Sequence, residues 1–179
     1  YIRTNSESLI GVITEKPGVD MSHGIAITSV LHTDPYSHVE PVRYPKGSGF
    51  FRMMVLPHVR FNHALQRWLH VFLALLRHPL RIFKLLFTGD FAQKSLILLY
   101  MRTLEGHLRF LPKRLFGYRG MGTAISAGQA PTASIPEATD IAERVAKRVD
   151  GQLMSMANET LFNIPTTAHI LGGCCMGDR

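Results

Sequence analysis

The segment KSLILLYMRTLEGHLRFL, residues 94–111, decides the fold class, because it contains two apolar stretches on either side of Glu105-Gly106. Two apolar stretches separated by a short turn predict a β-hairpin. A helix is an alternative for residues 95–101, since a continuous apolar run carries no clear period. We interpret the segment as a hairpin, which requires an antiparallel sheet.

Three further strands are predicted on the N-terminal side of this hairpin. Residues 24–32, GIAITSVLH, are short and rich in β-branched residues, as strands commonly are. Residues 38–44, HVEPVRY, alternate apolar and polar side chains, and Pro41 favours an edge strand or a bulge. Residues 49–57, GFFRMMVLP, form the third candidate, and the sequence PKGSG at 45–49 has the composition of a turn.

Residues 60–78 have the period of an amphipathic helix, and Pro79 is expected to break or kink it before the pattern continues to residue 87. The apolar face comprises Phe61, Leu65, Trp68, Leu69, Phe72, Leu76, Phe83 and Leu86. The basic face comprises Arg60, Arg67, Arg77, Arg81 and Lys84. Charged residues and histidines interrupt the region too often for a transmembrane span.

The positive charge around this helical region indicates which kinds of binding partner to expect. The chain has a net charge of +7, and no Asp or Glu occurs between Pro41 and Gly89. The apolar face either packs on the sheet as core, which we favour, or lies against lipid while the basic face meets anionic headgroups. No nucleic-acid partner is expected, because the basic residues are not interleaved with exposed aromatic residues and no known motif is present.

A second helix is predicted from residue 134 to residue 150. Ser134 is a candidate N-cap, Pro136 lies in the first turn, and Gly151 follows the last turn. Residues 117–133 are rich in Gly, Ala and Ser and predict an irregular loop. The fold class is therefore α+β, with antiparallel strands and helices on one side.

Two residues are candidates for chemistry. His169 is followed by Gly172-Gly173, which allow the backbone to approach a ligand, and histidine exchanges protons near neutral pH. Glu40 lies in a strand, where an inward carboxylate is costly unless it is paired or functional. From the pattern alone, we favour a structural role for His169 and a solvated or Arg43-paired position for Glu40.

The two cysteines, Cys174 and Cys175, are adjacent in the sequence. Neighbouring cysteines rarely satisfy disulfide geometry, so they are either a redox pair or, as we favour, small apolar groups. No His and Cys spacing suggests a metal site. The Gly47-Ser48-Gly49 loop lacks the pattern of a phosphate-binding loop.

The segment HILGGCCMG at 169–177 resembles the His-x-x-Gly-(Gly/Thr)-Cys-x-Met-Gly segment of the glucose–methanol–choline oxidoreductases. Its Gly-Gly form is most similar to the cholesterol-oxidase branch. RTNSESLIG at 3–11, SHVEPVRYPKGSG at 37–49 and SIPEAT at 134–139 also resemble that branch, in the expected order. The resemblance therefore covers nearly the whole chain.

The resemblance implies a substrate-binding domain at 1–166, with an antiparallel sheet backed by helices, and at 167–179 the start of the C-terminal active-site segment. The glycine-rich dinucleotide fingerprint and the later Asn-Pro segment of the family are absent from the sequence. The chain begins at Tyr1 and ends just after a glycine-rich run. We therefore interpret it as a piece of a longer polypeptide, inactive by itself.

The resemblance also implies an activity, the FAD-dependent oxidation of the CH–OH group of a sterol or similarly bulky alcohol. His169 matches the active-site histidine, and Glu40 matches the carboxylate that moves a proton from C4 to C6 during 5-ene to 4-ene isomerisation. Gly172, Gly173 and Cys174 would lie beside the flavin, which accepts the hydride.

Other functions and properties stay open at this stage. A non-catalytic module that binds lipid or a membrane surface through 60–87 is one alternative, and a degenerate remnant with a structural role is another. The electron acceptor is either oxygen or a carrier protein. A cytoplasmic or peripheral membrane location is favoured, and secretion remains an alternative.

Overall fold

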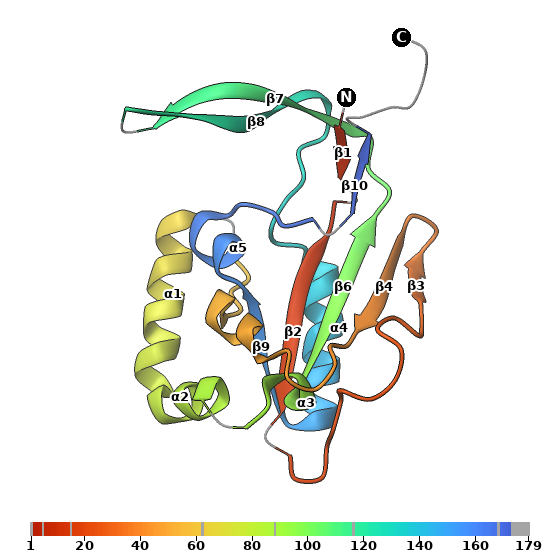
Figure 1. The fold of residues 1–179 in the computed structure, drawn as a ribbon, viewed down its shortest axis with the longest axis vertical. Coiled ribbons are helices and arrows are strands. Elements are labelled where there is room, and N and C mark those ends of the chain that lie inside the picture. Colours follow the sequence, from red (N-terminus) through yellow and green to blue (C-terminus); the bar gives the residue numbers. More distant parts are fainter. Residues whose placement is uncertain are drawn as a thin grey trace.

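The computed structural model describes residues 2–4, 6–14, 16–61, 63–87, 89–115, 117–167 and 169–172. The chain forms two antiparallel sheets with helices around the larger one, so the α+β prediction is confirmed (Figure 1). The larger sheet has the order β3 (Leu31–Asp34), β4 (Ser37–Val42), β6 (Ser95–Arg102), β2 (Ser8–Thr14), β9 (Gly151–Met156) and β5 (Val55–Pro57). The smaller sheet has the order β10 (Ile170–Gly172), β1 (Ile2–Thr4), β7 (Gly106–Leu115) and β8 (Tyr118–Gly128).

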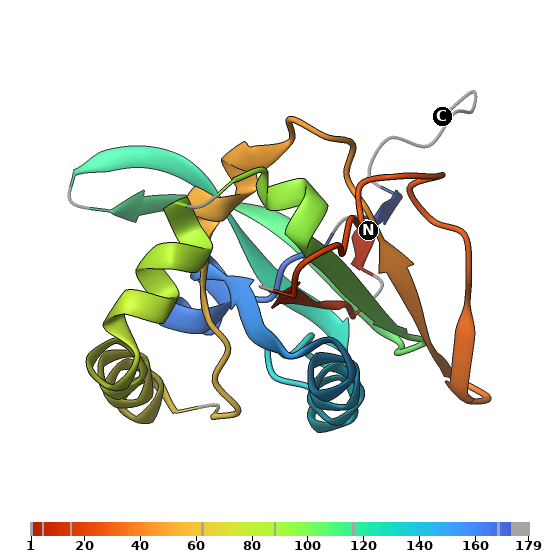
Figure 2. The ribbon, with the colours of Figure 1, turned by 90° about the horizontal axis from the view of Figure 1, so that it is seen from below.

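Helix α4 (Pro136–Val149) covers one face of the larger sheet and closes the main core (Figure 2). Its alanines 138, 142 and 146 lie against Ile10, Val12 and Tyr100, because small side chains let the helix approach the strands closely. The helix ends before Gly151, as predicted, but it begins at Pro136, two residues after the predicted start. Ser134 does not cap it; the N-cap is Ile135, and the Ser134 hydroxyl donates to the carbonyl of Arg60.

The segment 94–111 does form two strands, but the predicted hairpin is wrong. Strand β6 pairs with β2 on one side and β4 on the other, so neither of its edges is free to accept β7. The chain instead crosses from the larger to the smaller sheet at residues 103–105.

The prediction of an irregular loop at 117–133 holds for residues 129–133 but is wrong for residues 118–128, which form β8. Strand β8 pairs with β7 from Leu115↔Tyr118 to Gly106↔Gly128 and forms a long ribbon that projects from the body of the molecule (Figures 1 and 2). Most side chains of β8 are exposed. A strand that buries little has no reason to alternate apolar and polar residues, which is why its sequence indicated a loop.

The N-terminal strand predictions are partly right. Residues 24–32 are mostly irregular, with β3 beginning at Leu31, and residues 49–57 form a 3₁₀ helix (Gly49–Met54) before the short β5. The turn at 45–49 is present, with the amide of Ser48 donating to the carbonyl of Pro45. Pro41 lies in an interior strand, beyond the last β3–β4 pair at Leu31↔Val39 and just before an isolated bridge between Ile27 and Val42.

Helix α1 (Ala64–Arg77) ends just before Pro79, where α2 (Pro79–Phe87) begins, so the predicted break is confirmed. The favoured packing of its apolar face as core is wrong, because Trp68, Leu69 and Phe72 are half exposed. Arg67, predicted on the solvated face, is buried instead. No helix in the described part of the chain is long and apolar enough to cross a membrane.

Two short helices complete the fold. Helix α3 (Phe91–Lys94) precedes β6, and Asp90 caps it by accepting from the amide of Ala92. Helix α5 (Ala157–Phe162) follows β9 and ends at Asn163, which has a left-handed backbone conformation. The segment after α5 leads the chain back to the smaller sheet, where β10 pairs with β1.

Candidate active site

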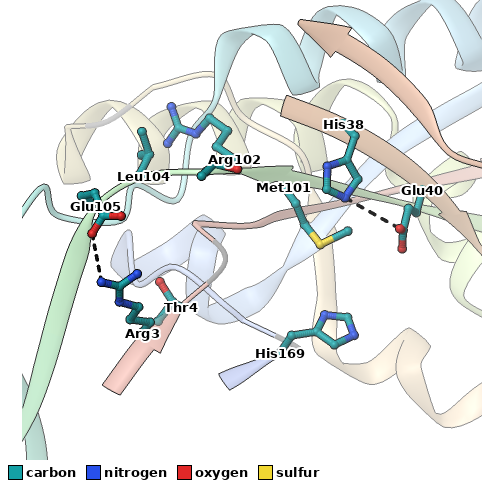
Figure 3. Close-up of a pocket in the computed structure, with 10 residues that line it drawn as sticks. Arg3, Thr4, His38, Glu40, Met101, Arg102, Leu104, Glu105 and His169 are labelled. Atoms are coloured by element: carbon teal, nitrogen blue, oxygen red, sulfur yellow. Dashed lines mark ion pairs between the residues drawn. The ribbon is translucent and has the colours of Figure 1, made fainter. Parts of the chain in front are cut away.

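A cavity of about 390 Å³ lies where the two sheets meet (Figure 3). Its volume is within the range of about 300–1,000 Å³ that is usual for small-molecule sites. Its walls come from β1, β4, β6, the crossing at 103–105 and the residue before β10. The lining residues are Arg3, Thr4, His38, Glu40, Met101, Arg102, Thr103, Leu104, Glu105 and His169.

Glu40 lies on the cavity side of β4. Val39 is buried under α4, and side chains alternate along a strand, so His38 and Glu40 share the opposite face. The Glu40 side chain is 17% exposed, and its Oε1 lies 3.7 Å from Nε2 of His38. Both favoured alternatives for Glu40 are wrong. It is not a solvated edge residue, because β4 lies inside the sheet and the side chain is mostly buried. It does not pair with Arg43, because Arg43 donates to the His23 carbonyl and to Thr28.

His169 directly precedes β10 and lines the same cavity as Glu40. Its side chain is 49% exposed, and Nδ1 lies 3.5 Å from Oε1 of Glu7. The backbone amide of His169 donates to the same oxygen at 3.1 Å. The fold therefore brings together the two residues that the motifs singled out, while their chemical roles stay predictions.

Most of the residues that line the rest of this cavity are polar. Arg3 forms an ion pair with Glu105 at 3.1 Å and donates from Nε to His107. Arg102 donates from Nη2 to Thr132 at 2.9 Å, and its buried Nε has no hydrogen-bond partner in the described structure. Such side chains can form hydrogen bonds with a polar or hydroxyl-bearing end of a ligand.

A second cavity of about 350 Å³ adjoins the first, since Thr4 lines both. It lies between the β7–β8 ribbon and the segment that follows α5. Its lining is mainly apolar and includes Ile2, Leu108, Phe110, Ile125, Ile164 and Ile170. Burial of apolar surface is favourable, so this cavity suits a hydrocarbon group.

Two buried carboxyl groups near His169 were missed by sequence reasoning, Glu7 and Glu159. Glu159 accepts a hydrogen bond from the amide of Thr166, and burial raises the pKa of Glu159 to about 7. Glu7 stands directly before the apolar strand β2. A carboxylate next to an apolar strand is a signal in the sequence for a buried acid. It does not identify one, because many solvated carboxylates stand in the same position.

Of the three residues predicted to lie beside a flavin, Gly172 is among the described residues. Gly172 pairs with Ile2 at the end of β10 and has φ +87°, a conformation that favours glycine. Gly173 and Cys174 lie outside the described residues. Helices α1, α2 and α4 do not follow a glycine-rich turn, as a dinucleotide-binding helix does.

Among the described residues, no group of three or more His, Cys, Asp or Glu side chains is placed to hold a metal ion. Imidazole and carboxylate groups such as those of His169 and Glu40 are able to exchange protons and to orient a hydroxyl group.

Comparison with known proteins relates the chain to cholesterol oxidases. It is 34% identical over 175 residues to a cholesterol oxidase of Acinetobacter baumannii, a match covering 98% of this chain and 32% of the relative. It is 34% identical over 185 residues to cholesterol oxidases of Mycobacterium tuberculosis strains CDC 1551 / Oshkosh and H37Rv, with the same coverage. No family model and no solved structure matches significantly.

These matches confirm the predicted relationship to the cholesterol-oxidase-like branch of the glucose–methanol–choline oxidoreductases. The chain spans about a third of the length of the curated relatives it matches. The similarity extends over nearly the whole chain and therefore includes both sheets and the cavity between them.

Proposed function

We propose that this chain is the substrate-binding part, residues 1–166, and the first active-site segment, residues 167–179, of an FAD-dependent oxidoreductase. The enzyme would oxidise the CH–OH group of a sterol or similarly bulky alcohol. The observation that carries the proposal is that His169 and Glu40 line one cavity at the junction of the sheets. The similarity to cholesterol oxidases supports the same activity.

The proposed mechanism assigns the alcohol proton to His169. The imidazole is half exposed at the cavity, so it can orient the hydroxyl group of a bound alcohol and accept its proton. FAD, held mainly by polypeptide outside this chain, would accept the hydride from the carbinol carbon. The adjoining apolar cavity offers room for the hydrocarbon part of the substrate.

Glu40 is proposed to serve a second proton transfer. With a 5-ene sterol, its carboxylate would take the proton from C4 and return it at C6, which moves the double bond to the 4-ene position. The side chain is mostly buried beside His38. A carboxyl group shielded from water in this way can hold and release a proton within a confined site.

The test uses the full-length, flavin-loaded protein. His169→Ala should lower kcat at least about 100-fold, the usual scale of acid–base contributions. His70→Ala is the matched control, because His70 is exposed on α1 and does not line the cavity. Near-normal turnover by His169→Ala would refute the assigned role.

A second substitution tests the division of labour between the two residues. Glu40→Gln should reduce isomerisation more than alcohol oxidation, because the amide cannot carry the proton between C4 and C6. The two rates are separated by following formation of the unconjugated 5-ene ketone, the product of oxidation alone, and of the conjugated 4-ene ketone. Equal loss of both rates would count against separate roles.

A second candidate function is binding to a lipid surface through residues 60–87. The observation that favours it is the exposure of the apolar face of α1 and α2, where Leu65, Leu80 and Phe83 are more than 60% exposed. Exposed apolar patches mark interaction sites. The neighbouring basic residues, and the lack of acidic ones from Pro41 to Gly89, complement anionic headgroups.

Co-sedimentation with vesicles of neutral lipid, with and without anionic lipid, tests this second function. Salt-sensitive binding to the anionic vesicles is expected, and Phe72→Ser should weaken it. Phe110→Ser is the control, since Phe110 is similarly exposed but lies on the β7–β8 ribbon. Absence of binding to anionic vesicles, or an equal loss of binding in both variants, would refute this second function.

A further inference from the structure

Glu7 is a buried carboxylate that the proposed mechanism does not use. It lies in the short connection where the chain passes from β1 to β2, that is, from one sheet to the other. Its side chain is fully shielded from solvent. A carboxylate in such a place is costly unless hydrogen bonds or charges compensate for the lost water.

The described contacts of Glu7 converge on the segment that carries His169. Its Oε1 accepts from the hydroxyl of Thr167 at 2.8 Å and from the amide of His169 at 3.1 Å. The same oxygen lies 3.5 Å from Nδ1 of the imidazole. One carboxylate oxygen therefore faces the backbone and the ring of the residue proposed to accept the substrate proton.

The backbone around Glu7 is shaped to make this approach. Ser6 has φ +48°, a left-handed conformation that a residue with a side chain adopts at some cost. Ser6 is also buried. Pairing of Thr4 with Ile170 ends just before this turn, so the turn, rather than the strand ladder, directs Glu7 towards residues 167–169.

We propose that Glu7 is a positioning residue for His169, an inference that rests on the proposed function. An ionised carboxylate only accepts hydrogen bonds, so it favours the imidazole form that carries its proton on Nδ1. Nε2 is then left as an acceptor for the hydroxyl proton of a ligand in the cavity. The amide and Thr167 contacts fix where the ring is held.

The test compares two fully buried glutamates in the full-length, flavin-loaded protein. Glu7→Gln should lower kcat about 10- to 100-fold, the scale of orienting partners, with unchanged KM and flavin content. Glu159→Gln is the matched control, because Glu159 accepts from Thr166 but has no described contact with His169. A kcat of Glu7→Gln within about twofold of the wild type would overturn the proposal.

A double-mutant cycle separates positioning from a general structural role. If Glu7 acts through His169, Glu7→Gln should have no further effect on kcat in a His169→Ala background. An undiminished effect there would overturn the proposal. If Glu7→Gln does not fold, Thr167→Val replaces it, with a smaller loss of kcat that should also vanish in the His169→Ala background.

A measurement without turnover distinguishes this proposal from the proposed function. Hydrogen exchange, read by mass spectrometry on the peptide containing residues 167–172, should become faster in Glu7→Gln and stay unchanged in Glu159→Gln. Unchanged exchange in Glu7→Gln would refute the anchoring. Normal turnover by His169→Ala would refute the proposed function while leaving the exchange result intact.

Discussion

Replacing Arg67 by methionine should destabilise the chain far more than the same change elsewhere in α1. Arg67 is 2% exposed. Its Nε donates to the carbonyl of Thr160 at 2.7 Å, and its other nitrogens donate to the carbonyls of Phe61 and Glu159. The guanidinium thus joins α1 to the carboxyl end of α5. Methionine fills similar space but donates no hydrogen bond, so these carbonyls lose a donor.

The size of the effect follows from these contacts. Each hydrogen bond from a charged donor contributes about 1.5–3 kcal/mol, and contributions within one network are not additive. Disruption of a buried charged group of this kind typically costs about 3–5 kcal/mol. At about 2–4 °C per kcal/mol for a chain of this length, the Tm should fall by about 6–20 °C.

Arg77→Met is the matched control, since Arg77 lies exposed in the last turn of the same helix. Its free energy of unfolding should change by no more than about 0.5 kcal/mol. Urea unfolding and thermal unfolding followed by circular dichroism measure both variants. Equal Tm values for Arg67→Met and Arg77→Met would refute the assignment of Arg67 as a buried connection.

Three further predictions concern stability. Burial lowers the pKa of His58 to about 4, so the contribution of His58 to stability is fully present above pH 6.5 and is lost as the pH falls towards 4; His58→Gln should remove about 3 kcal/mol of this dependence in urea titrations. Burial raises the pKa of Glu159 to about 7, so stability falls as pH rises from 4.5 to 7, and Glu159→Gln should abolish that decline. Gly128→Ala should speed proteolysis of the β7–β8 ribbon, because its Cβ would lie 2.1 Å from the carbonyl oxygen of Glu105; Gly120→Ala, with open space, should not.

Local signals in the sequence predicted the elements that depend on local chemistry. Pro136 and Gly151 fixed both ends of α4, and Pro79 divided α1 from α2. These residues act through their own backbone preferences, which do not depend on distant neighbours. The strand at β4 was found for a similar reason, since its alternating side chains reflect one face against α4 and another towards the cavity.

The elements that the sequence could not predict are those that depend on contacts with distant parts of the chain. Nothing within 94–111 shows that β2 and β4 already occupy both edges of β6, which excludes the predicted hairpin. The burial of Arg67 also depends on a distant part of the chain. Its position on the helix indicated solvent, but a guanidinium can be buried where several carbonyls converge on it, and those carbonyls belong partly to α5.

The candidate site depends on the passage of the chain from one sheet to the other, which is also the reason that the hairpin prediction is wrong. The chain passes from one sheet to the other at residues 6–7 and again at residues 103–105. The second crossing lines the cavity directly, and the first carries Glu7 to the segment of His169. A hairpin at 94–111 would have kept β7 beside β6 and left no junction between sheets. Motifs could therefore single out His169 and Glu40, but only the paths of β1–β2 and β6–β7 bring them to a common cavity.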